Sequence, residues 1–414
     1  MHYYRYNGSI ILSQNKLQDF DTSSETEAQC CAGSVYVVNP SDPAISRRSF
    51  SISNNDLLFL KKEDSTLLDY PREVYPEPAL WLKEKILNLQ AVSLNPCYPS
   101  WKDVLSSVHP DSWRINIAGM GDVGGTLALG LRLLGGSNIA SIGIYDLDEN
   151  KLKRYEYELN QVNGPSFSSN FPKVEILDEK NLFECDIFIF AVTAGVPPVG
   201  AENKDVRLTQ LNANSKIIEL YAKKARKTGF KGIFAVMSDP VDQLCAHAFK
   251  TSNTGRDGSF DYNGLAPEQI RGFGLGVMNA RALYYSSRIS EFSQYAIEGR
   301  AFGPHGNGLI IADSVPRYDQ EKSQRLTRMV ERANLKVREI GYKPYMAPAM
   351  SSGALSIIAL IEGDWHYSSV FLGGAFIGCR NRLHQSGTEL ERLHLPQVLL
   401  ERIQGLWGLL GATR

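Results

Sequence analysis

The chain has 414 residues, of which 43% are hydrophobic and 21% charged, and its formal net charge is −1. This length predicts two or three domains, and the composition is typical of a globular protein with a large core. The balanced charge argues against nucleic acid or an anionic membrane surface as the main partner, and no apolar run reaches the ~18 residues of a membrane-spanning helix.

The start of the chain and its cysteines indicate the cellular compartment. Residues 1–5 are polar throughout and lack the apolar stretch of a secretory signal. The six cysteines form neither a disulfide framework nor the spacing of a zinc site. We therefore expect reduced thiols, no metal and a cytoplasmic location.

Residues 1–110 are irregular in texture. Polar clusters such as 21–26 alternate with short strand-like runs at 35–38 and 57–60, and residues 76–92 follow a helical pattern introduced by prolines. We predict a small α+β extension. No motif in it carries recognisable chemistry, so a lid, an oligomerisation element and a partner-binding domain all remain open.

From Trp113 onward the pattern changes to strand, glycine turn, helix and strand. The predicted strands have apolar interiors and alternate with helices, which is typical of a parallel, doubly wound sheet. We predict a Rossmann-type α/β domain over residues 111–260. Its strands are expected at 114–118, 139–145, 186–192 and 231–237, and its first helix at 126–134.

Residues 261–414 have a looser pattern, with more helix and fewer apolar strands. We predict a second α+β domain that packs against the first and holds the substrate. Its helices are expected at 275–291, 319–340 and 347–362, and short strands around 367–376.

A glycine-rich run joins the first predicted strand to the first helix, where a dinucleotide-binding G-x-G-x-x-G motif belongs. Gly119 permits a tight turn, Gly121 lets the backbone approach a pyrophosphate, and Gly124 lets the helix pack closely on the strand. Amides at the helix start face the phosphates, aided by the helix dipole. The run also contains Asp122 and Val123.

Asp146 ends the second strand, at the separation expected for the acid that binds a ribose diol. A carboxylate there repels a 2′-phosphate, so the predicted cofactor is NAD rather than NADP. The alternative is a structural glycine turn with an ordinary aspartate at the end of the strand.

Five further runs resemble, in the same order, segments of the lactate/malate dehydrogenase family. The resemblance extends from about residue 113 to the C-terminus and leaves the extension outside. The runs are Val192-Thr193-Ala194-Gly195-Val196-Pro197, Asn212-Ala213-Asn214-Ser215-Lys216-Ile217, Val236-Met237-Ser238-Asp239-Pro240-Val241-Asp242, Gly276-Val277-Met278-Asn279-Ala280-Arg281 and Gly303-Pro304-His305-Gly306.

The resemblance implies a reversible hydride transfer between NAD and a small 2-hydroxy/2-oxo acid. By the same resemblance His305 exchanges a proton with the substrate oxygen, and Arg281 grips the substrate carboxylate at two points. The implied assembly is a homo-oligomer, a dimer or tetramer. Thr193, Ala194 and Gly195 are implied to lie beside the nicotinamide.

The chain departs from the family pattern at the partner of the histidine. The family has an aspartate three residues before the substrate arginine, and this chain has Met278, whose thioether cannot orient an imidazole. Where the family has an asparagine, this chain has Asp239. One hypothesis joins both changes: Asp239 supplies the missing carboxylate, which requires it to lie within about 3.2 Å of a His305 nitrogen.

The substrate loop departs as well. Pro197 and Pro198 occupy the first positions where the family carries arginine, which leaves Lys204 or Arg207 to meet a second substrate carboxylate. A lysine does not replace the planar fork of an arginine, so malate is an unfavourable substrate.

Three functions remain open. The leading one is an NAD-dependent dehydrogenase acting on a 2-hydroxy/2-oxo acid. The second is an NAD(H)-binding sensor or interaction module that has lost this reaction. The third, ranked below both, is a dehydrogenase of an amino-bearing compound whose cation pairs with Asp239.

Overall fold

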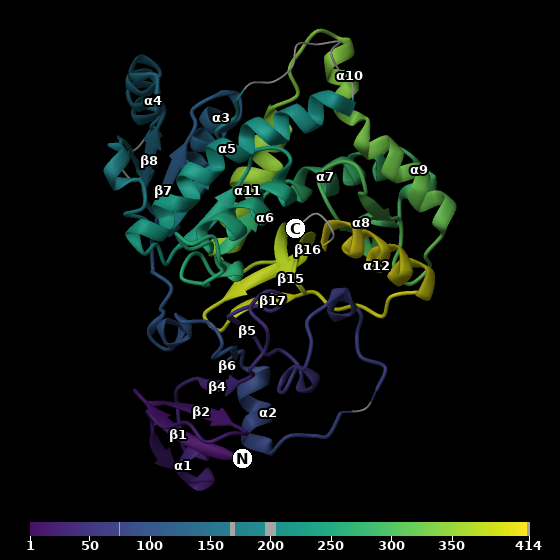
Figure 1. The fold of residues 1–414 in the computed structure, drawn as a ribbon. Helices are drawn as coiled ribbons and strands as arrows, with labels where there is room; N and C mark the ends of the chain where they lie inside the picture. Colours follow the sequence, from purple (N-terminus) through teal and green to yellow (C-terminus); the bar gives the residue numbers. More distant parts are fainter. Residues whose placement is uncertain (74, 166–169, 195–203, 412–414) are drawn as a thin grey trace.

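A computed structural model describes residues 1–73, 75–165, 170–194 and 204–411, and of residues 204–210 only the backbone. In this part of the chain, a six-stranded sheet forms the N-terminal region and a nine-stranded sheet forms the centre (Figure 1). A two-stranded ribbon, β13 (Arg300–Phe302) with β14 (Ile310–Ala312), lies beside them. No described helix is both long enough and apolar enough to span a bilayer.

The N-terminal sheet mixes parallel and antiparallel pairs, in the order β3-β1-β2-β4-β6-β5. Successive side chains along a strand point to opposite faces of this sheet, so that Tyr36 and Val38 pack on one face and Val35 and Val37 on the other. The strands are β1 (His2–Tyr6), β2 (Ser9–Ser13), β3 (Asp21–Ser23), β4 (Val35–Val38), β5 (Ser49–Ser51) and β6 (Ala91–Leu94), with helices α1 (Glu25–Gln29) and α2 (Leu80–Leu87). An α+β extension is therefore observed, as predicted.

Three local predictions in this region were wrong. Residues 57–60 are no strand: a 3₁₀ turn, η1 (Asn55–Leu57), begins where the Asn54 side chain accepts the backbone N–H of Asn55. The polar run 21–26 holds β3 and the start of α1. The predicted helix over 76–92 ends at Leu87, because residues from Ala91 pair between β4 and β5. Tertiary pairing overrides local helical pattern here.

Six strands of the nine-stranded sheet are parallel and doubly wound, in the order β12-β11-β10-β7-β8-β9. This confirms the predicted Rossmann-type fold class. The strands are β7 (Trp113–Ala118), β8 (Ile139–Tyr145), β9 (Lys173–Ile176), β10 (Ile187–Phe190), β11 (Ile233–Val236) and β12 (Ile270–Gly272). Strands β9 and β12 were not predicted, because they are short and β9 exposes three of its four residues.

Helices cover both faces of this sheet, and β10 shows how. Its side chains alternate, so Ile187 and Ile189 join the core under one group of helices while Phe188 and Phe190 join the core under the other. The first face is covered by α3 (Asp122–Leu134), α4 (Glu149–Gln161) and α11 (Leu355–Ile361), and the second by α5 (Lys204–Thr228) and α6 (Val241–Ser252).

The C-terminal strands continue the same sheet with antiparallel pairing. Strand β15 pairs with β12 at Ser369 and Gly272, and β16 and β17 follow it. The boundary at residue 261 stays a prediction. The strands are β15 (His366–Leu372), β16 (Ala375–His384) and β17 (Gly387–Leu390).

The helices of residues 261–414 are shorter than predicted. The helix expected over 319–340 is divided at Arg332, and the stretch 347–362 begins with a π-helical segment, Pro348–Ala354, before α11. The remaining helices are α7 (Leu275–Ser286), α8 (Tyr295–Glu298), α9 (Gln320–Glu331), α10 (Ala333–Glu339) and α12 (Gln397–Gly411).

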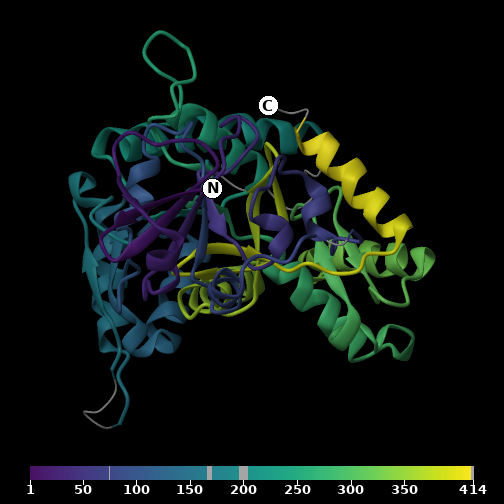
Figure 2. The same cartoon turned by 90° about the horizontal axis from the view of Figure 1, so that it is seen from below.

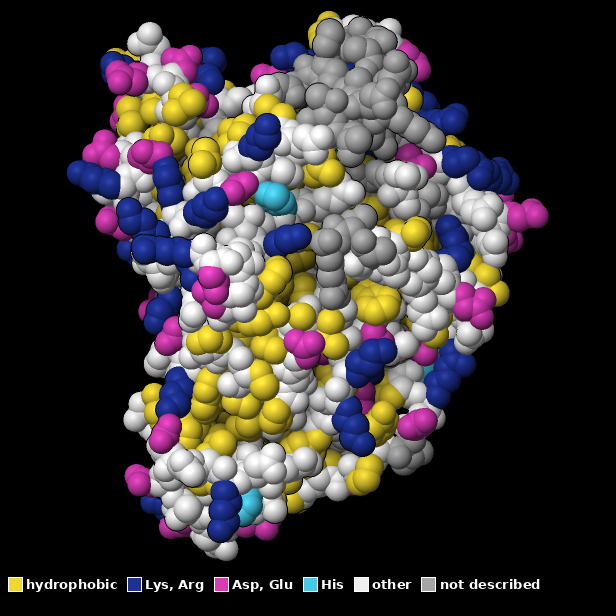
Figure 3. Space-filling view, viewed as in Figure 1, with side chains coloured by type: hydrophobic (Ala, Val, Ile, Leu, Met, Phe, Trp, Pro, Cys, Tyr) yellow, Lys and Arg dark blue, Asp and Glu magenta, His cyan; other side chains and the backbone are white. Residues whose placement is uncertain are grey.

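The extension is packed firmly on the C-terminal elements. One apolar core contains Ile10 and Val37 from the N-terminal sheet together with Ile377 of β16 and Ile403 of α12. Figure 1 shows β5 of the extension beside β17, and Figure 2, seen from the side of the extension, shows the purple N-terminal strands in front of the central sheet. On the face shown in Figure 3, hydrophobic side chains gather in the lower centre, while charged side chains of both signs alternate along the left margin.

Candidate active site

The glycine-rich run forms a tight loop at the carboxyl end of β7. Gly119 has a φ of +95°, and a Cβ there would lie 2.8 Å from the backbone of Ala191. A Cβ on Gly124 would collide with the carbonyl oxygen of Gly119. Gly121 is different, because no atom lies within 4 Å of the position a Cβ would take. Its backbone is therefore open to a ligand, as a pyrophosphate requires.

Helix α3 begins at Asp122, four residues before the predicted start at Thr126, because Gly121 is extended and serves as its N-cap. The first helical hydrogen bond is donated by the N–H of Gly125 to the carbonyl oxygen of Gly121, at 2.9 Å. The amides of Asp122 and Val123 belong to the helix start, where backbone donors lack acceptors within the helix. These donors fit an anion such as a pyrophosphate.

Asp146 directly follows β8 and is held by three donors. Its carboxylate accepts the N–H groups of Met120 (2.8 Å) and Asp148 (3.1 Å), and Lys151 Nζ lies 3.0 Å from Oδ1. Burial raises the pKa of the Asp146 carboxyl, but these backbone donors and the ammonium outweigh burial and bring it below its ordinary value. Asp146 is thus an anion beside the glycine loop, as a ribose-binding acid must be.

The segment predicted to border the nicotinamide follows β10. Ala194 donates its N–H to Asn214 Oδ1 at 2.9 Å, and Asn214 Nδ2 donates to the carbonyl oxygen of Asp239 at 2.7 Å. Asn214 is wholly buried, so it joins the loops after β10 and β11. Sequence reasoning gave Asn214 no role, although it lies in one of the family-like runs.

Of four further predicted residues, the structure describes Thr193 in full, Lys204 and Arg207 by their backbone alone, and Gly195 not at all. Thr193 lies beside Ala194 after β10, whereas Gly195 is outside the described residues. Lys204 and Arg207 lie in the first turns of α5, and their side chains are outside the description.

His305 and Asp239 meet across the site. Asp239 follows β11 and His305 follows β13, and His305 Nδ1 lies 3.0 Å from Asp239 Oδ1. This distance meets the condition that the sequence hypothesis set. The histidine rests on Gly274, where a Cβ would lie 2.8 Å from its own Cβ. Its second ring nitrogen, Nε2, is buried and has no hydrogen-bond partner among the described residues.

A second carboxylate, Asp242, lies beneath His305, and sequence reasoning missed its role. It is buried and accepts a hydrogen bond from Ser369 Oγ at 2.5 Å. Burial raises the pKa of Asp242 to about 6, against the opposing effects of the Ser369 hydroxyl and of His305. A polar residue three positions after Asp239, facing inward from the first turn of α6, was the available signal.

Arg281 lies on α7, close enough to Asp239 for their charges to interact. Burial lowers the pKa of its guanidinium, while the tyrosine Tyr285 and the negative charge of Asp239 raise it. Arg281 Nη1 lies 3.6 Å from Met278 Sδ and 3.4 Å from the carbonyl oxygen of Val330. Met278 itself is 3% exposed and belongs to an apolar core cluster.

The structure therefore brings together a histidine, a carboxylate and an arginine. Asp146, Asp239 and the glycine loop follow the carboxyl ends of parallel strands, and Arg281 lies on α7, the helix that follows β12. Parallel strands present their carboxyl ends at one edge of the sheet, where ligands of such folds bind. A dinucleotide and a small polar substrate fit this edge.

Comparison with known proteins supports this assignment. Residues 113–260 match the family model described as "lactate/malate dehydrogenase, NAD binding domain". The L-lactate dehydrogenase of Halalkalibacterium halodurans is 26% identical over 285 residues, which are 63% of this chain and 84% of that protein. The L-lactate dehydrogenase of Staphylococcus saprophyticus is 27% identical over 290 residues, 63% of this chain and 84% of that protein.

Solved structures share the fold. A lactate dehydrogenase from a Medee basin deep-sea metagenome library has a TM-score of 0.59 at 20% identity, covering 73% of this chain and 98% of that one. The malate dehydrogenase of Archaeoglobus fulgidus in complex with NADH has a TM-score of 0.57 at 18% identity, covering 72% and 98%. The match to an NAD-binding domain confirms NAD as the predicted cofactor.

Proposed function

The chain belongs to the lactate/malate dehydrogenase family, and on this premise we propose that it catalyses hydride transfer between NAD and a small 2-hydroxy/2-oxo acid. The observation that carries the proposal is the 3.0 Å contact between His305 Nδ1 and Asp239 Oδ1. When bound, NAD supplies the hydride acceptor or donor, and the protein positions and polarises the substrate.

His305 is the proposed acid and base. Asp239 accepts a hydrogen bond from the Nδ1–H group, which sets the tautomer and stabilises the ring cation. Nε2 is then the atom that exchanges a proton with the substrate oxygen, and it is the nitrogen whose hydrogen-bonding capacity is unused among the described residues. Histidine suits this role because both of its protonation states are accessible near neutral pH.

Arg281 is the proposed carboxylate anchor. Its guanidinium is largely removed from solvent, and its hydrogen-bond contacts among the described residues are two long ones, to Met278 Sδ and the Val330 carbonyl oxygen. No carboxylate of the described residues forms an ion pair with it. A substrate carboxylate offers stronger, two-point hydrogen bonds in a planar arrangement, and these also orient the reacting carbonyl.

We propose a monocarboxylic substrate. A dicarboxylate requires a second cation, and the sequence offers only Lys204 or Arg207 for it, beyond the two prolines that occupy the family's arginine positions. The absence of a planar fork at Pro198 disfavours a second carboxylate.

The test is turnover by the purified chain. NADH oxidation is followed with pyruvate, 2-oxobutyrate, phenylpyruvate and oxaloacetate, and the expected result is turnover with a monocarboxylic acid and little with oxaloacetate. Asp239→Asn should lower kcat about 10²-fold without changing the Kd of NADH, because the imidazole loses its orienting carboxylate. NADH binding without turnover on any acid would contradict the proposal.

A second function is favoured by Met278. The buried thioether and its contact with Arg281 leave no aspartate at the family's position, which suits an NAD(H)-binding sensor that has lost the reaction. This alternative predicts tight NADH binding and wild-type behaviour of Asp239→Asn in every assay.

We also infer a homo-oligomer, a dimer or tetramer, from the family relationship. Light scattering during size-exclusion chromatography measures the mass directly, and a monomer at micromolar concentration would contradict it. A cytoplasmic location stays a prediction from the sequence.

A further inference from the structure

A pocket lies between the end of α7 and the helices α9 and α10, and we refer to it as the α9 pocket. Its volume is about 330 Å³, within the range of roughly 300–1,000 Å³ that is typical of sites for small molecules. No carboxylate is among the described residues that line it. These residues are Tyr285, Arg325, Arg328, Met329, Arg332 and Lys336.

The four basic residues of the pocket form one stripe along α9 and α10. Their spacing of three or four residues places them on the same side of consecutive helical turns. The division between the two helices at Arg332 does not interrupt the stripe, since all four side chains line the same pocket. Positive charges so close together repel each other, and a bound anion relieves that repulsion.

Of the four, only Arg325 has its charge balanced by a carboxylate of the described residues. Glu291 binds it through two contacts of 2.7 Å. Arg328, Arg332 and Lys336 form no ion pair within the described part of the chain. All three are exposed, and Lys336 Nζ lies 5.3 Å from the centroid of the Tyr285 ring. The pocket therefore presents three uncompensated positive charges to the solvent.

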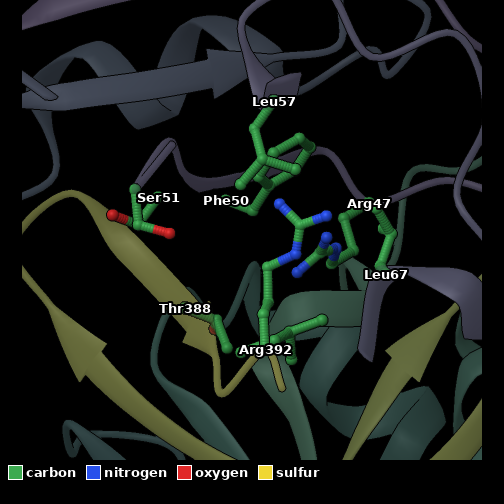
Figure 4. A pocket seen from close by; sticks show the side chains of 9 residues that line it. Arg47, Phe50, Ser51, Leu57, Leu67, Thr388 and Arg392 are labelled. Carbon is green, nitrogen blue, oxygen red and sulfur yellow. The ribbon is translucent and has the colours of Figure 1, made fainter. Parts of the chain in front are cut away.

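A second arginine-rich pocket differs in both size and charge. Arg47 and Arg392 lie in a pocket at the seam between the extension and the C-terminal strands (Figure 4). Each is paired with a buried acid, Glu63 at 2.6 Å and Asp56 at 2.7 Å. The volume of that pocket is about 10 Å³, room for about one water molecule. The seam arginines thus join parts of the fold, whereas the α9 pocket has both space for a ligand and charges to hold it.

From these observations we propose that the α9 pocket binds a small molecule that carries two linked phosphate groups. A phosphate group carries roughly 1.5–2 negative charges at pH 7, so two groups supply the charge that balances the three cations. Arg328 and Arg332 offer planar forks that match phosphate oxygens, and Lys336 adds a point charge. The site does not depend on the proposed dehydrogenase activity.

The test uses the full chain saturated with NADH, so that the glycine loop is occupied, and inorganic pyrophosphate as the probe. Calorimetric titration at constant ionic strength in chloride, without divalent metal ions, should show one saturable site per chain. Orthophosphate should bind at least about tenfold more weakly, because one phosphate group engages fewer of the cations. The variant R328Q/R332Q removes both exposed forks and should weaken pyrophosphate binding at least about tenfold.

The matched control is K227Q/R256Q, which removes two positive charges from exposed positions at the end of α5 and after α6. It should bind pyrophosphate as the unmodified chain does. If R328Q/R332Q fails to fold, diffraction from crystals of the unmodified chain soaked in pyrophosphate decides, and density for the anion against Arg328 and Arg332 supports the site. Equal pyrophosphate binding by both double variants, equal binding of orthophosphate and pyrophosphate, no binding beyond chloride, or density only at other positions overturns it.

Discussion

The glycine loop and the His305 cluster lie at the same edge of one sheet, yet they are built in different ways. The loop uses backbone from a single strand-turn-helix segment, and its essential contacts are between Gly119, Gly124 and the neighbouring backbone of β10. The cluster uses side chains from separate segments, with Asp239 after β11 and His305 after β13.

This difference matters for how each part tolerates change. A backbone loop depends on the absence of side chains, so the family motif persists in it unchanged. A side-chain cluster can exchange one carboxylate for another when both reach the same nitrogen. We propose that Asp239, 3.0 Å from His305, is such an exchange, while Met278 packs in an apolar core.

The largest expected effect tests the side-chain cluster. His305→Gln should lower kcat about 10²- to 10⁴-fold, because the amide cannot exchange a proton with the substrate oxygen. The Kd of NADH should stay unchanged, as measured by fluorescence titration. His394→Gln, which alters a ring contact with Tyr70 far along the chain, is the control. Loss of NADH affinity in His305→Gln would show that the two regions are not separable.

The second effect concerns the carboxylate beneath the cluster. Burial holds the pKa of Asp242 near 6 in the folded chain, above its unfolded value of 3.8. Its contribution to stability is therefore fully present below pH ~4 and is lost as pH rises through about 6. Asp242→Asn removes this dependence. The free energy of unfolding of the variant minus that of the unmodified chain should therefore be larger at pH 7.5 than at pH 4, by up to about 3 kcal/mol.

Urea unfolding at the two pH values measures that gain. The exposed Asp111 gives the control variant Asp111→Asn, which should show no such change. A constant difference between Asp242→Asn and the unmodified chain across this range would mean that Asp242 is ionised in the folded state.

The third prediction separates two functions of the glycine loop, cofactor binding at Gly121 and backbone stability at Gly119. Gly121→Val should weaken NADH binding about tenfold and leave Tm unchanged, because the new side chain enters open space that the pyrophosphate needs. Gly119→Ala should instead destabilise the chain by about 1–2 kcal/mol, since it has a positive φ and a crowded Cβ position. Differential scanning calorimetry and NADH titration of both variants decide, and equal Tm losses would contradict the division.

The smallest effect concerns cofactor choice. Lys151 offsets part of the Asp146 charge that repels a 2′-phosphate, so Lys151→Ala should raise the preference for NADH over NADPH about two- to fivefold. Lys153→Ala, on the same helix and paired with Glu149, is the matched control. An unchanged preference in Lys151→Ala would show that the pairing does not influence the nucleotide.

Local patterns predicted the central fold well, for physical reasons visible in β8 and β10. The strand at 139–145 has the bounds expected, and the predicted strand at 186–192 contains β10, whose four buried residues form the continuous apolar run of a buried parallel strand. The first two residues of β6 were instead included in a helix, and the state of this strand depends on pairing with β4 and β5, which a local pattern does not contain.

The residues of the candidate site also fall into those that local spacing predicts and those that depend on tertiary structure. Gly119, Gly121 and Asp146 follow from spacing within one βαβ unit. The approach of Asp239 to His305 required a family resemblance to suggest it and tertiary structure to measure it. The positions of Asp242 and Asn214 in the site were missed, because each depends on burial between segments that are distant in sequence.

The core shared by the extension and the C-terminal helix has a consequence for biosynthesis. Ile10 and Val37 are synthesised well before their core partners on β16 and α12. The apolar face of the first sheet therefore has no cover during most of translation, which favours aggregation and chaperone binding. The apolar residues of the extension thus reach their final packing only after β16 and α12 have been synthesised.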